Sequence, residues 1–205
     1  DNISVKEINP WVNEGLLLES EARTNLLTYS NDFANAAYST FQTAFTTGQT
    51  NTLTGAADAV LRQHSGATGT SNWSEGLSVA TSTAHTFSIY AKAGGVSWIR
   101  LHGAGFTTPA DGGAYFNLSD GSIGTTSAGY TPTVEDCGNG WYRLAITFTT
   151  DAVDGYGALN MNLAEADNDM SFASATTSDS VYIYGAQFEA GSTPSSYIPT
   201  SGSTV

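Results

Sequence analysis

The residues best suited to chemistry stand at alternate positions of one short run, SWIRLH. In this run Trp98, Arg100 and His102 alternate with the apolar residues Ile99 and Leu101. Because side chains alternate between the two faces of a β-strand, the first three share one face and the apolar pair points to the core. An indole beside a guanidinium and an imidazole combines a flat apolar surface with hydrogen-bonding groups, which suits the recognition of a sugar ring and its substituents.

Four further strand-like runs place aromatic and polar side chains on an outward face by the same rule. We select from these runs Tyr90, Lys92, Trp141, Arg143, Asn162 and Tyr184. We predict that they join Trp98, Arg100 and His102 on one open face of a sheet. Lys92, Arg100 and Arg143 are three of only six basic residues in the chain, so this face would suit an anionic polysaccharide.

The same face has a second interpretation. Another layer of the protein, or its N-terminal segment, would cover the face instead of leaving it open to a ligand. The two arginines, Arg100 and Arg143, would then pair with acids such as Glu19, Glu135 or Glu189.

Strand signals dominate the elements that must position these residues. Apolar and polar residues alternate in short runs bounded by Gly, Asp, Asn and Pro, and Asp120-Gly121 is a hairpin signal between two such runs. One short helix is predicted over residues 31–38. Trp73 lies in the polar stretch 69–74, where it is either an exposed contact or a packing residue. Short strands without helices between them predict an all-β fold, an antiparallel β-sandwich of the jelly-roll type.

Composition excludes two classes of partner. The chain has 6 Lys and Arg against 19 Asp and Glu, for a formal net charge of -13. Nucleic-acid phosphates and anionic membrane surfaces both attract a surplus of cations, so we expect neither nucleic acid nor membrane as a partner. No apolar run approaches the ~18 residues of a membrane-spanning helix. The length of 205 residues fits one domain.

Several segments resemble modules of bacteriophage tail and phage-like structural proteins. They are the opening run 15–33, which contains Asn25-Leu26-Leu27, the middle segments SIYAKAGGVSWIRL and VEDCGNGWYRLAITFT, and the closing VYIYGAQFEAGSTPSSYIPTSGSTV. The chain is also similar to the jelly-roll carbohydrate-binding modules of polysaccharide-degrading enzymes, through the Asn-Leu-Leu run and the strand Tyr-Ala-Lys-Ala. The resemblance covers most of the chain.

This resemblance implies a non-catalytic, lectin-like domain, extracellular or virion-associated, that binds a polysaccharide and adjoins other domains of a longer protein. We expect a tail at residues 1–14, the jelly-roll module at 15–198 and a linker at 199–205. A structural assembly module of a phage tail or adhesin is the alternative. A jelly-roll polysaccharide lyase is a third possibility, although the Arg-x-Glu-x-Arg and Gln-Ile-His strands of such lyases are missing.

The function requires no cofactor, but the resemblance implies that a structural Ca²⁺ is possible. Calcium takes several oxygen ligands. The candidates are Glu19, Glu21, Asp58 and Asp179, or the acidic loop 165–169. The other interpretation of these acids is that they are simply solvated.

Overall fold

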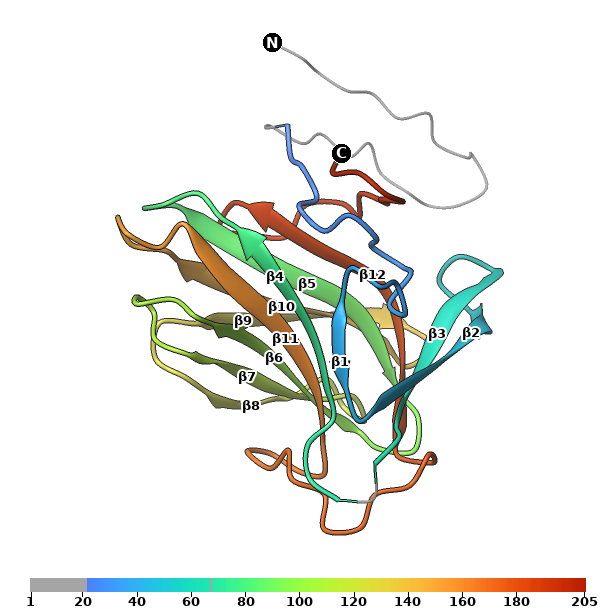
Figure 1. Cartoon of the computed structure of the whole chain (residues 1–205). Helices are drawn as coiled ribbons and strands as arrows, with labels where there is room; N and C mark the ends of the chain where they lie inside the picture. The colour runs from blue at the N-terminus through green and yellow to red at the C-terminus, as the bar shows by residue number, and fades with distance from the viewer. Residues whose placement is uncertain (1–21, 67) are drawn as a thin grey trace.

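The computed structural model describes residues 22–66 and 68–205, and these fold into a two-layer β-sandwich (Figure 1). The strands are β1 (Ser39–Phe41), β2 (Thr43–Asn51), β3 (Ala56–His64), β4 (Asn72–Ser78), β5 (Ala84–Ala93), β6 (Trp98–Ala104), β7 (Gly112–Asn117), β8 (Ile123–Thr126), β9 (Thr131–Gly138), β10 (Trp141–Thr149), β11 (Tyr156–Ala164) and β12 (Ser180–Ala190).

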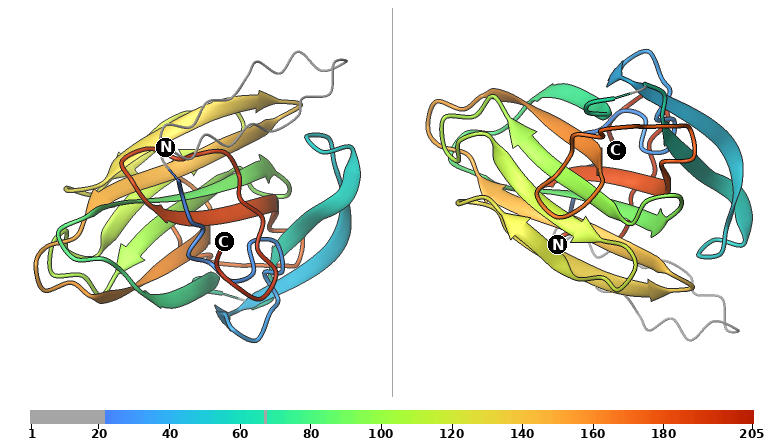
Figure 2. Two further views of the ribbon diagram at one scale, coloured as in Figure 1. Left: turned by 90° about the horizontal axis from the view of Figure 1, so that it is seen from above. Right: turned by 90° about the horizontal axis from the view of Figure 1, so that it is seen from below.

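These strands form two six-stranded antiparallel sheets. Sheet I has the order β1-β4-β11-β6-β7-β8, and sheet II has the order β2-β3-β12-β5-β10-β9. Figure 2 shows the two layers from above and below, with β2 and β3 at one side of the molecule. The predicted antiparallel β-sandwich of the jelly-roll type is confirmed. The predicted hairpin at Asp120-Gly121 joins the paired strands β7 and β8.

The core lies between the sheets and is built from one face of each central strand. Alternation along the strand-like runs predicts a set of inward residues, and nearly all of them are buried: Phe87, Ile89, Ala91, Ile99, Leu101, Leu144, Ile146, Phe148, Leu159, Met161, Leu163, Val181 and Ile183. Tyr142, which the same rule predicts to point inward, is partly buried against this core. Burial of each large aliphatic or aromatic side chain contributes about 1.5–3 kcal/mol. This core fixes which residues of the same strands must face outward.

Trp73 belongs to the core and not to an exposed loop. It lies on β4, and none of its surface is exposed. Its indole packs against Phe33, Tyr38 and Phe87, with ring centroids 6.0, 4.6 and 6.4 Å away. Trp73 is therefore a packing residue, which was one of the two interpretations of the sequence.

Arg62 of β3 is fully buried between the sheets. Its Nη2 donates to the carbonyl oxygens of Ser71 and Met161 at 3.1 and 3.0 Å, while Nε and Nη1 have no partner. None of the described acids pairs with it. Burial lowers the pKa of this guanidinium from its ordinary value to about 9. Arg62 thus ties sheet II to sheet I at a cost in desolvation.

Residues 31–38 form turns, so the predicted helix is wrong. The backbone N–H of Asn35 donates to Asp32 and that of Tyr38 donates to Asn35, each over three residues. The Asn35 side chain also bonds Asp32 Oδ2 and the N–H of Ala37. Local side-chain bonds of this kind favour turns over a helix. Within the described residues, no helix is long and apolar enough to cross a membrane.

Segments 25–30 and 200–205 lie antiparallel to each other beside β12. The N–H of Asn25 donates to the carbonyl of Val205 at 2.8 Å, and two further backbone hydrogen bonds join the segments. Figure 1 shows the two segments together at one end of the sandwich. Residues 200–205, which we expected to be part of a linker, are paired with the module in this structure. Residues 1–14 lie outside the described residues.

Asn25 holds its segment against β12. Its side chain is fully buried, and Nδ2 donates to the carbonyl oxygens of Ala186 and Ile198 at 3.1 and 2.9 Å. Its Oδ1 accepts the N–H groups of Leu27 and Phe188, both at 3.1 Å. The amide uses its full hydrogen-bonding capacity, so the Asn-Leu-Leu run has a structural role here.

Candidate functional site

The prediction of a single open face is wrong, because its residues lie on two sheets. The outer face of sheet I carries Trp98, Arg100, His102 and Asn162, and strands of sheet II carry Tyr90, Lys92, Trp141, Arg143 and Tyr184. Alternation along a strand predicts the face on which a side chain lies, but not the sheet to which the strand belongs. β5 and β6 follow each other in sequence, yet the chain passes from sheet II to sheet I between them.

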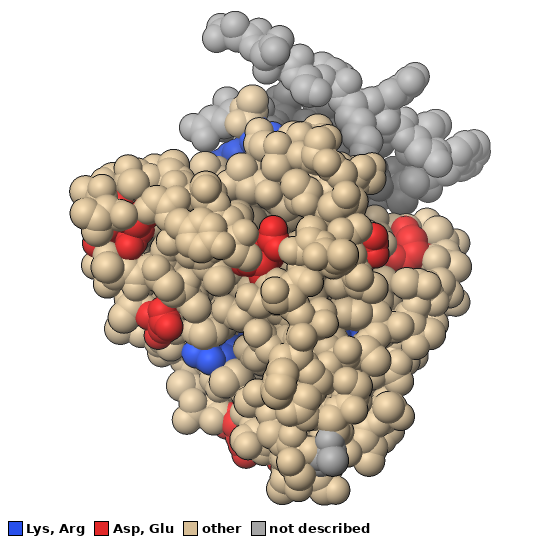
Figure 3. Space-filling view, viewed as in Figure 1, with Lys and Arg blue, Asp and Glu red and all other residues tan. Residues whose placement is uncertain are grey.

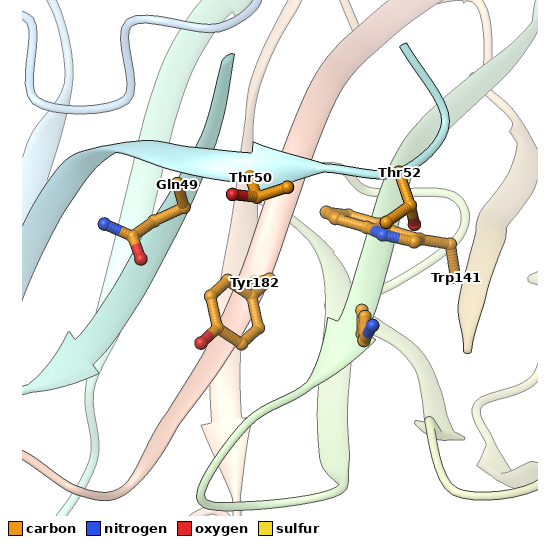
Figure 4. A pocket seen from close by; sticks show the side chains of 6 residues that line it. Gln49, Thr50, Thr52, Trp141 and Tyr182 are labelled. Carbon is orange, nitrogen blue, oxygen red and sulfur yellow. The ribbon is translucent and has the colours of Figure 1, made fainter. Parts of the chain in front are cut away.

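A cleft of about 420 Å³ lies on the outer face of sheet II (Figure 4). We call it the cleft; its lining residues are Gln49, Thr50, Thr52, Lys92, Trp141 and Tyr182. Residues of β2 and β10 meet here although β12, β5 and β3 separate these strands, so sheet II curves around the cleft. Figure 4 shows the three residues at β2 facing Tyr182 and Trp141.

One row of cross-strand partners forms the floor and one wall of the cleft. Lys92 on β5 is in register with Trp141 on β10 and with Tyr182 on β12. Only 1% of the Trp141 surface is exposed, so this indole is a wall and not an open stacking platform. Tyr182 is half-buried and offers part of its ring. No described residue forms a hydrogen bond or an ion pair with the Lys92 ammonium.

The next row of sheet II is closed, not open. Tyr184 packs against Tyr197 of the C-terminal segment with ring centroids 5.3 Å apart, and Tyr90 lies 6.0 Å from Tyr184. The Arg143 guanidinium lies 5.3 Å from the Tyr90 ring centre and donates to Ser88 Oγ at 3.2 Å. Burial raises the pKa of Tyr184 to about 12. Tyr197 therefore packs over Tyr90 and Tyr184, and Arg143 is buried beside Tyr90, although all three are predicted as ligand-binding residues. The alternative interpretation expects cover from another layer or the N-terminal segment, whereas the contact described here comes from the C-terminal segment, and no described acid forms an ion pair with Arg143.

The outer face of sheet I carries the second group of predicted residues. We call this surface the asparagine face; it comprises Phe41, Asn72, Asn160, Asn162, Arg100 and His102, with a cavity of about 340 Å³ over it that Thr70 and Met170 also line. In Figure 3, which shows this side of the molecule, most of the surface is uncharged and a small basic patch lies over β6 and β7. Arg100 is the only Lys or Arg in the strands of sheet I.

His102 is neutral at neutral pH. Burial, followed by the positive charge of Arg100, lowers the pKa of its imidazole from 6.5 to about 4, against a smaller opposing effect of Asp111. The imidazole therefore offers one donor and one acceptor to a ligand, without a charge.

Trp98 lies at one end of sheet I, outside the cavity of the asparagine face. It is half-buried, and a Cβ on Gly124 of β8 would lie 2.7 Å from its ring and 2.2 Å from Asp167 Oδ1. Asp167 in turn accepts the N–H of Thr125 at 2.7 Å. Loop 165–170 is thus held across this end of the sheet, and Trp98 packs beside it.

The acids proposed for calcium do not form one site in the part of the chain that the structure describes. Asp58 and Asp179 are placed at opposite ends of β3 by its pairing with β12, six residues or about 20 Å apart. Asp58 Oδ1 accepts from Thr54, and Asp179 Oδ2 accepts from Thr176. Glu19 and Glu21 lie outside the described residues. No group of three or more potential ligands, loop 165–169 included, gathers among the described residues.

Comparisons with known proteins show the fold. The chain is similar in structure to the enzymatically active domain of tailspike protein 4 of bacteriophage CBA120, with a TM-score of 0.50, 12% identity and coverage of 82% of this chain and 21% of that chain. It also matches a structure from work on the promiscuous specificity of carbohydrate-binding modules of the β-sandwich superfamily, with a TM-score of 0.42, 10% identity and coverage of 80% of this chain and 62% of that chain. No protein-family model and no curated sequence matches the chain. The predicted fold-level resemblance to a phage tail protein is confirmed.

The sequence analysis did not select nine residues that line the two surfaces. They are Gln49, Thr50, Thr52 and Tyr182 in the cleft and Phe41, Thr70, Asn72, Asn160 and Met170 on the asparagine face. Alternation turns Tyr182 and Asn160 outward beside the selected Tyr184 and Asn162, so that signal could have found them. The other seven come from loops or from strands with weak signals, which are β1, β2 with the turn that follows it, and the start of β4. Only the pairing of these strands with distant parts of the chain brings the residues to a surface with the predicted ones.

Proposed function

We propose that this chain is a carbohydrate-binding module and that its cleft holds a segment of an anionic polysaccharide. The observation that carries this proposal is the row Trp141, Lys92 and Tyr182 in a ligand-sized cleft whose lining residues include no Asp, Glu or His. The chain as a whole carries 19 acids and a net charge of -13. The lining of the cleft differs from this average because it has one ammonium and no carboxylate, and its local charge therefore favours a negative ligand.

Each part of the lining has a role in such a complex. The exposed part of the Tyr182 ring packs on the C–H face of a sugar, and Trp141 closes one side of the cleft. The Lys92 ammonium pairs with a carboxylate or sulfate of the polymer. The amide of Gln49 and the hydroxyls of Thr50 and Thr52 bond sugar hydroxyls from the opposite wall. Affinity at one cleft is modest and is multiplied by repetition along a polymer or within an assembly.

Binding without catalysis fits this lining best. Polysaccharide hydrolysis uses a pair of carboxyl groups, and the six lining residues include none. Elimination needs a general base, and Lys92 and Tyr182 are the lining side chains of a type that could supply one. The similar tailspike domain is named as enzymatically active, so the test is direct. Incubation with uronate polysaccharides should produce neither reducing ends nor the ultraviolet absorbance of an unsaturated product, and either signal would contradict the proposal.

The fold similarity to a tailspike domain supports a location on a virion tail or on a secreted glycan-binding protein. It also supports the second candidate, a structural module that packs against neighbouring domains. Sedimentation of the isolated chain separates the two: a monomer retained on polysaccharide favours the binding module, and a defined oligomer that ignores glycans favours the assembly module.

Retention on immobilised polysaccharides tests the cleft. We expect the chain to be retarded in gels that contain an acidic polysaccharide, and Lys92→Gln and Tyr182→Ala to lose most of that retardation. The matched control is Tyr156→Ala, because Tyr156 is 64% exposed and belongs to sheet I, away from the cleft. Retardation equal to wild type in both cleft variants would reject the cleft as the site.

A further inference from the structure

The asparagine face presents a row of side chains in register across four strands of sheet I. Phe41 of β1 pairs with Asn72 of β4, Asn72 with Asn162 of β11, and Asn162 with Arg100 of β6. Neighbouring strands lie about 4.8 Å apart, so the row spans about 14 Å from Phe41 to Arg100. That length exceeds one sugar ring, so an extended ligand lying across the strands would touch every member of the row.

Three amides form a hydrogen-bonded chain in this face. Asn162 Nδ2 donates to Asn72 Oδ1 at 3.1 Å, and Asn72 Nδ2 donates to Asn160 Oδ1 at 3.1 Å. The chain fixes the orientation of the amides and leaves Asn160 Nδ2 without a partner among the described residues. At the other end, Asn162 Oδ1 is buried and has no hydrogen-bond partner. The face therefore offers oriented amide groups with unused hydrogen-bonding capacity.

Arg100 at the end of the row has no counter-charge. Its Nη1 donates to the sulfur of Met170 at 3.5 Å, and the guanidinium lies 5.4 Å from the centre of the Tyr115 ring. Its Nε is buried without a partner, and no described acid forms an ion pair with Arg100. A guanidinium held by a ring and a thioether keeps its planar donors available for a carboxylate.

Phe41 supplies the opposite end of the row. Its ring is 57% exposed, which makes it one of few large apolar side chains on the described surface. A flat exposed ring beside oriented amides is the arrangement that packs on the apolar face of a sugar while its hydroxyls are bonded. None of the residues that line the cavity is Asp or Glu, and His102 among them is uncharged at neutral pH.

We propose that the asparagine face is a second glycan site, specific for an acidic oligosaccharide. A sugar ring packs on Phe41, the amides of Asn72 and Asn160 bond hydroxyls, and the carboxylate of a later uronate unit pairs with Arg100. This site is separate from the cleft because the two lie on the outer faces of opposite sheets. The inference shares its ligand class with the proposed function, and a module with both sites would cross-link two polysaccharide chains.

Titration calorimetry with tetragalacturonate, tetramannuronate and their methyl-esterified forms tests this site. For at least one acidic tetramer we expect two sites per wild-type chain and one site in Tyr182→Ala. On the Tyr182→Ala background, Arg100→Gln should lower the affinity for the acidic tetramer roughly tenfold, because one charge-assisted contact is lost, and should leave the affinity for the esterified tetramer unchanged. Phe41→Ala should lower the affinity for both forms. The control Ile123→Ala, at a residue of β8 that is 45% exposed, should lower neither affinity.

The outcomes separate this proposal from the cleft. If the wild-type chain has one site, and Tyr182→Ala abolishes binding while Arg100→Gln does not, the proposal for the asparagine face is overturned and the cleft is supported. If the wild-type chain has one site, and Arg100→Gln and Phe41→Ala abolish binding while Tyr182→Ala does not, the asparagine face is supported and the cleft is rejected. Binding of none of the four probes would overturn the proposal for the asparagine face. Thermal unfolding of every variant shows that a loss of binding is not a loss of fold.

Discussion

The side-chain amide of Asn25 donates to the carbonyl oxygen of Ile198 at 2.9 Å, so residues 173 positions apart in the chain are joined by one buried group. Its three other hydrogen bonds tie the same amide to β12 and to its own segment. This single side chain therefore joins both terminal segments to β12, beside the backbone hydrogen bonds that pair the two segments.

Replacement of Asn25 by Ala should lower the free energy of unfolding by about 2–4 kcal/mol. The substitution removes this partner from the N–H groups of Leu27 and Phe188 and from two carbonyl oxygens, and each unsatisfied buried group costs about 1–3 kcal/mol before relaxation. Equilibrium unfolding in urea measures the change. Thr193→Ala, at an exposed position in the same C-terminal segment, is the control and should change stability by less than about 0.5 kcal/mol.

His102 should make stability fall as the solution becomes acidic. The folded-state pKa of about 4 lies below the ordinary value of 6.5, so between these pH values the unfolded chain binds a proton that the folded chain resists. The stabilisation is complete above pH 6.5 and is lost as the pH falls to about 4. Relative to wild type, His102→Gln should remove roughly 2 kcal/mol of this dependence after allowance for solvent screening.

Denaturant unfolding of both proteins at neutral pH and near pH 4 measures that difference. His85, which is buried and also has a lowered pKa, is present in both and serves as the internal reference. Parallel pH dependences of wild type and His102→Gln would show that the imidazole titrates normally. Arg100→Gln should raise the pKa of His102, as followed by NMR of the imidazole protons, because it removes a neighbouring positive charge.

Replacement of Arg62 by Met should leave the protein as stable or make it more stable, by up to about 2 kcal/mol. The arginine is fully buried without an acid, and two of its three nitrogens lack a hydrogen-bond partner, whereas a thioether chain of similar length fills the space without desolvating a charge. Arg62→Ala should instead destabilise, because it leaves a cavity. The two variants are compared by urea unfolding, and a strong loss of stability in Arg62→Met would show that the charge is needed.

Gly124→Ala should destabilise the protein by about 1–3 kcal/mol and displace loop 165–170. The new methyl group would lie 2.2 Å from Asp167 Oδ1 and 2.7 Å from the Trp98 ring, closer than such atoms approach. Gly155→Ala is the matched control, because a methyl group there meets no atom within 4 Å. Tryptophan fluorescence and urea unfolding report the effect, and equal behaviour of the two variants would contradict the packing described for Trp98.

The sequence predicted the layers of the fold because the alternation of side chains is a local property. The inward pair Ile99 and Leu101 and the outward pair Arg100 and His102 were assigned from six adjacent residues, and the structure has them so. The division between sheets depends on hydrogen bonds between distant strands, which no local pattern contains. For that reason Lys92 and Arg100 were placed on one face although they lie on opposite sheets.

Local sequence patterns also do not predict whether another segment of the chain covers the outer face of a sheet. Tyr184 and Tyr90 alternate outward as an open face would require, and only the return of Tyr197 from the C-terminal segment closes them. Phe41 was missed for the opposite reason, because β1 has three residues and no hydrophobic period of its own. Its position depends on register with Asn72, whose strand was interpreted as a polar loop.

The antiparallel pairing of segments 25–30 and 200–205 also sets the mechanical behaviour of the domain. A pulling force applied between Asn25 and Val205 meets the hydrogen bond of this pair first and the bonds nearer Ser30 and Thr200 afterwards. Tension along the chain would thus peel the two segments apart one bond at a time instead of shearing all bonds together. Under a small load these two segments would therefore separate while the two sheets of the module stayed intact.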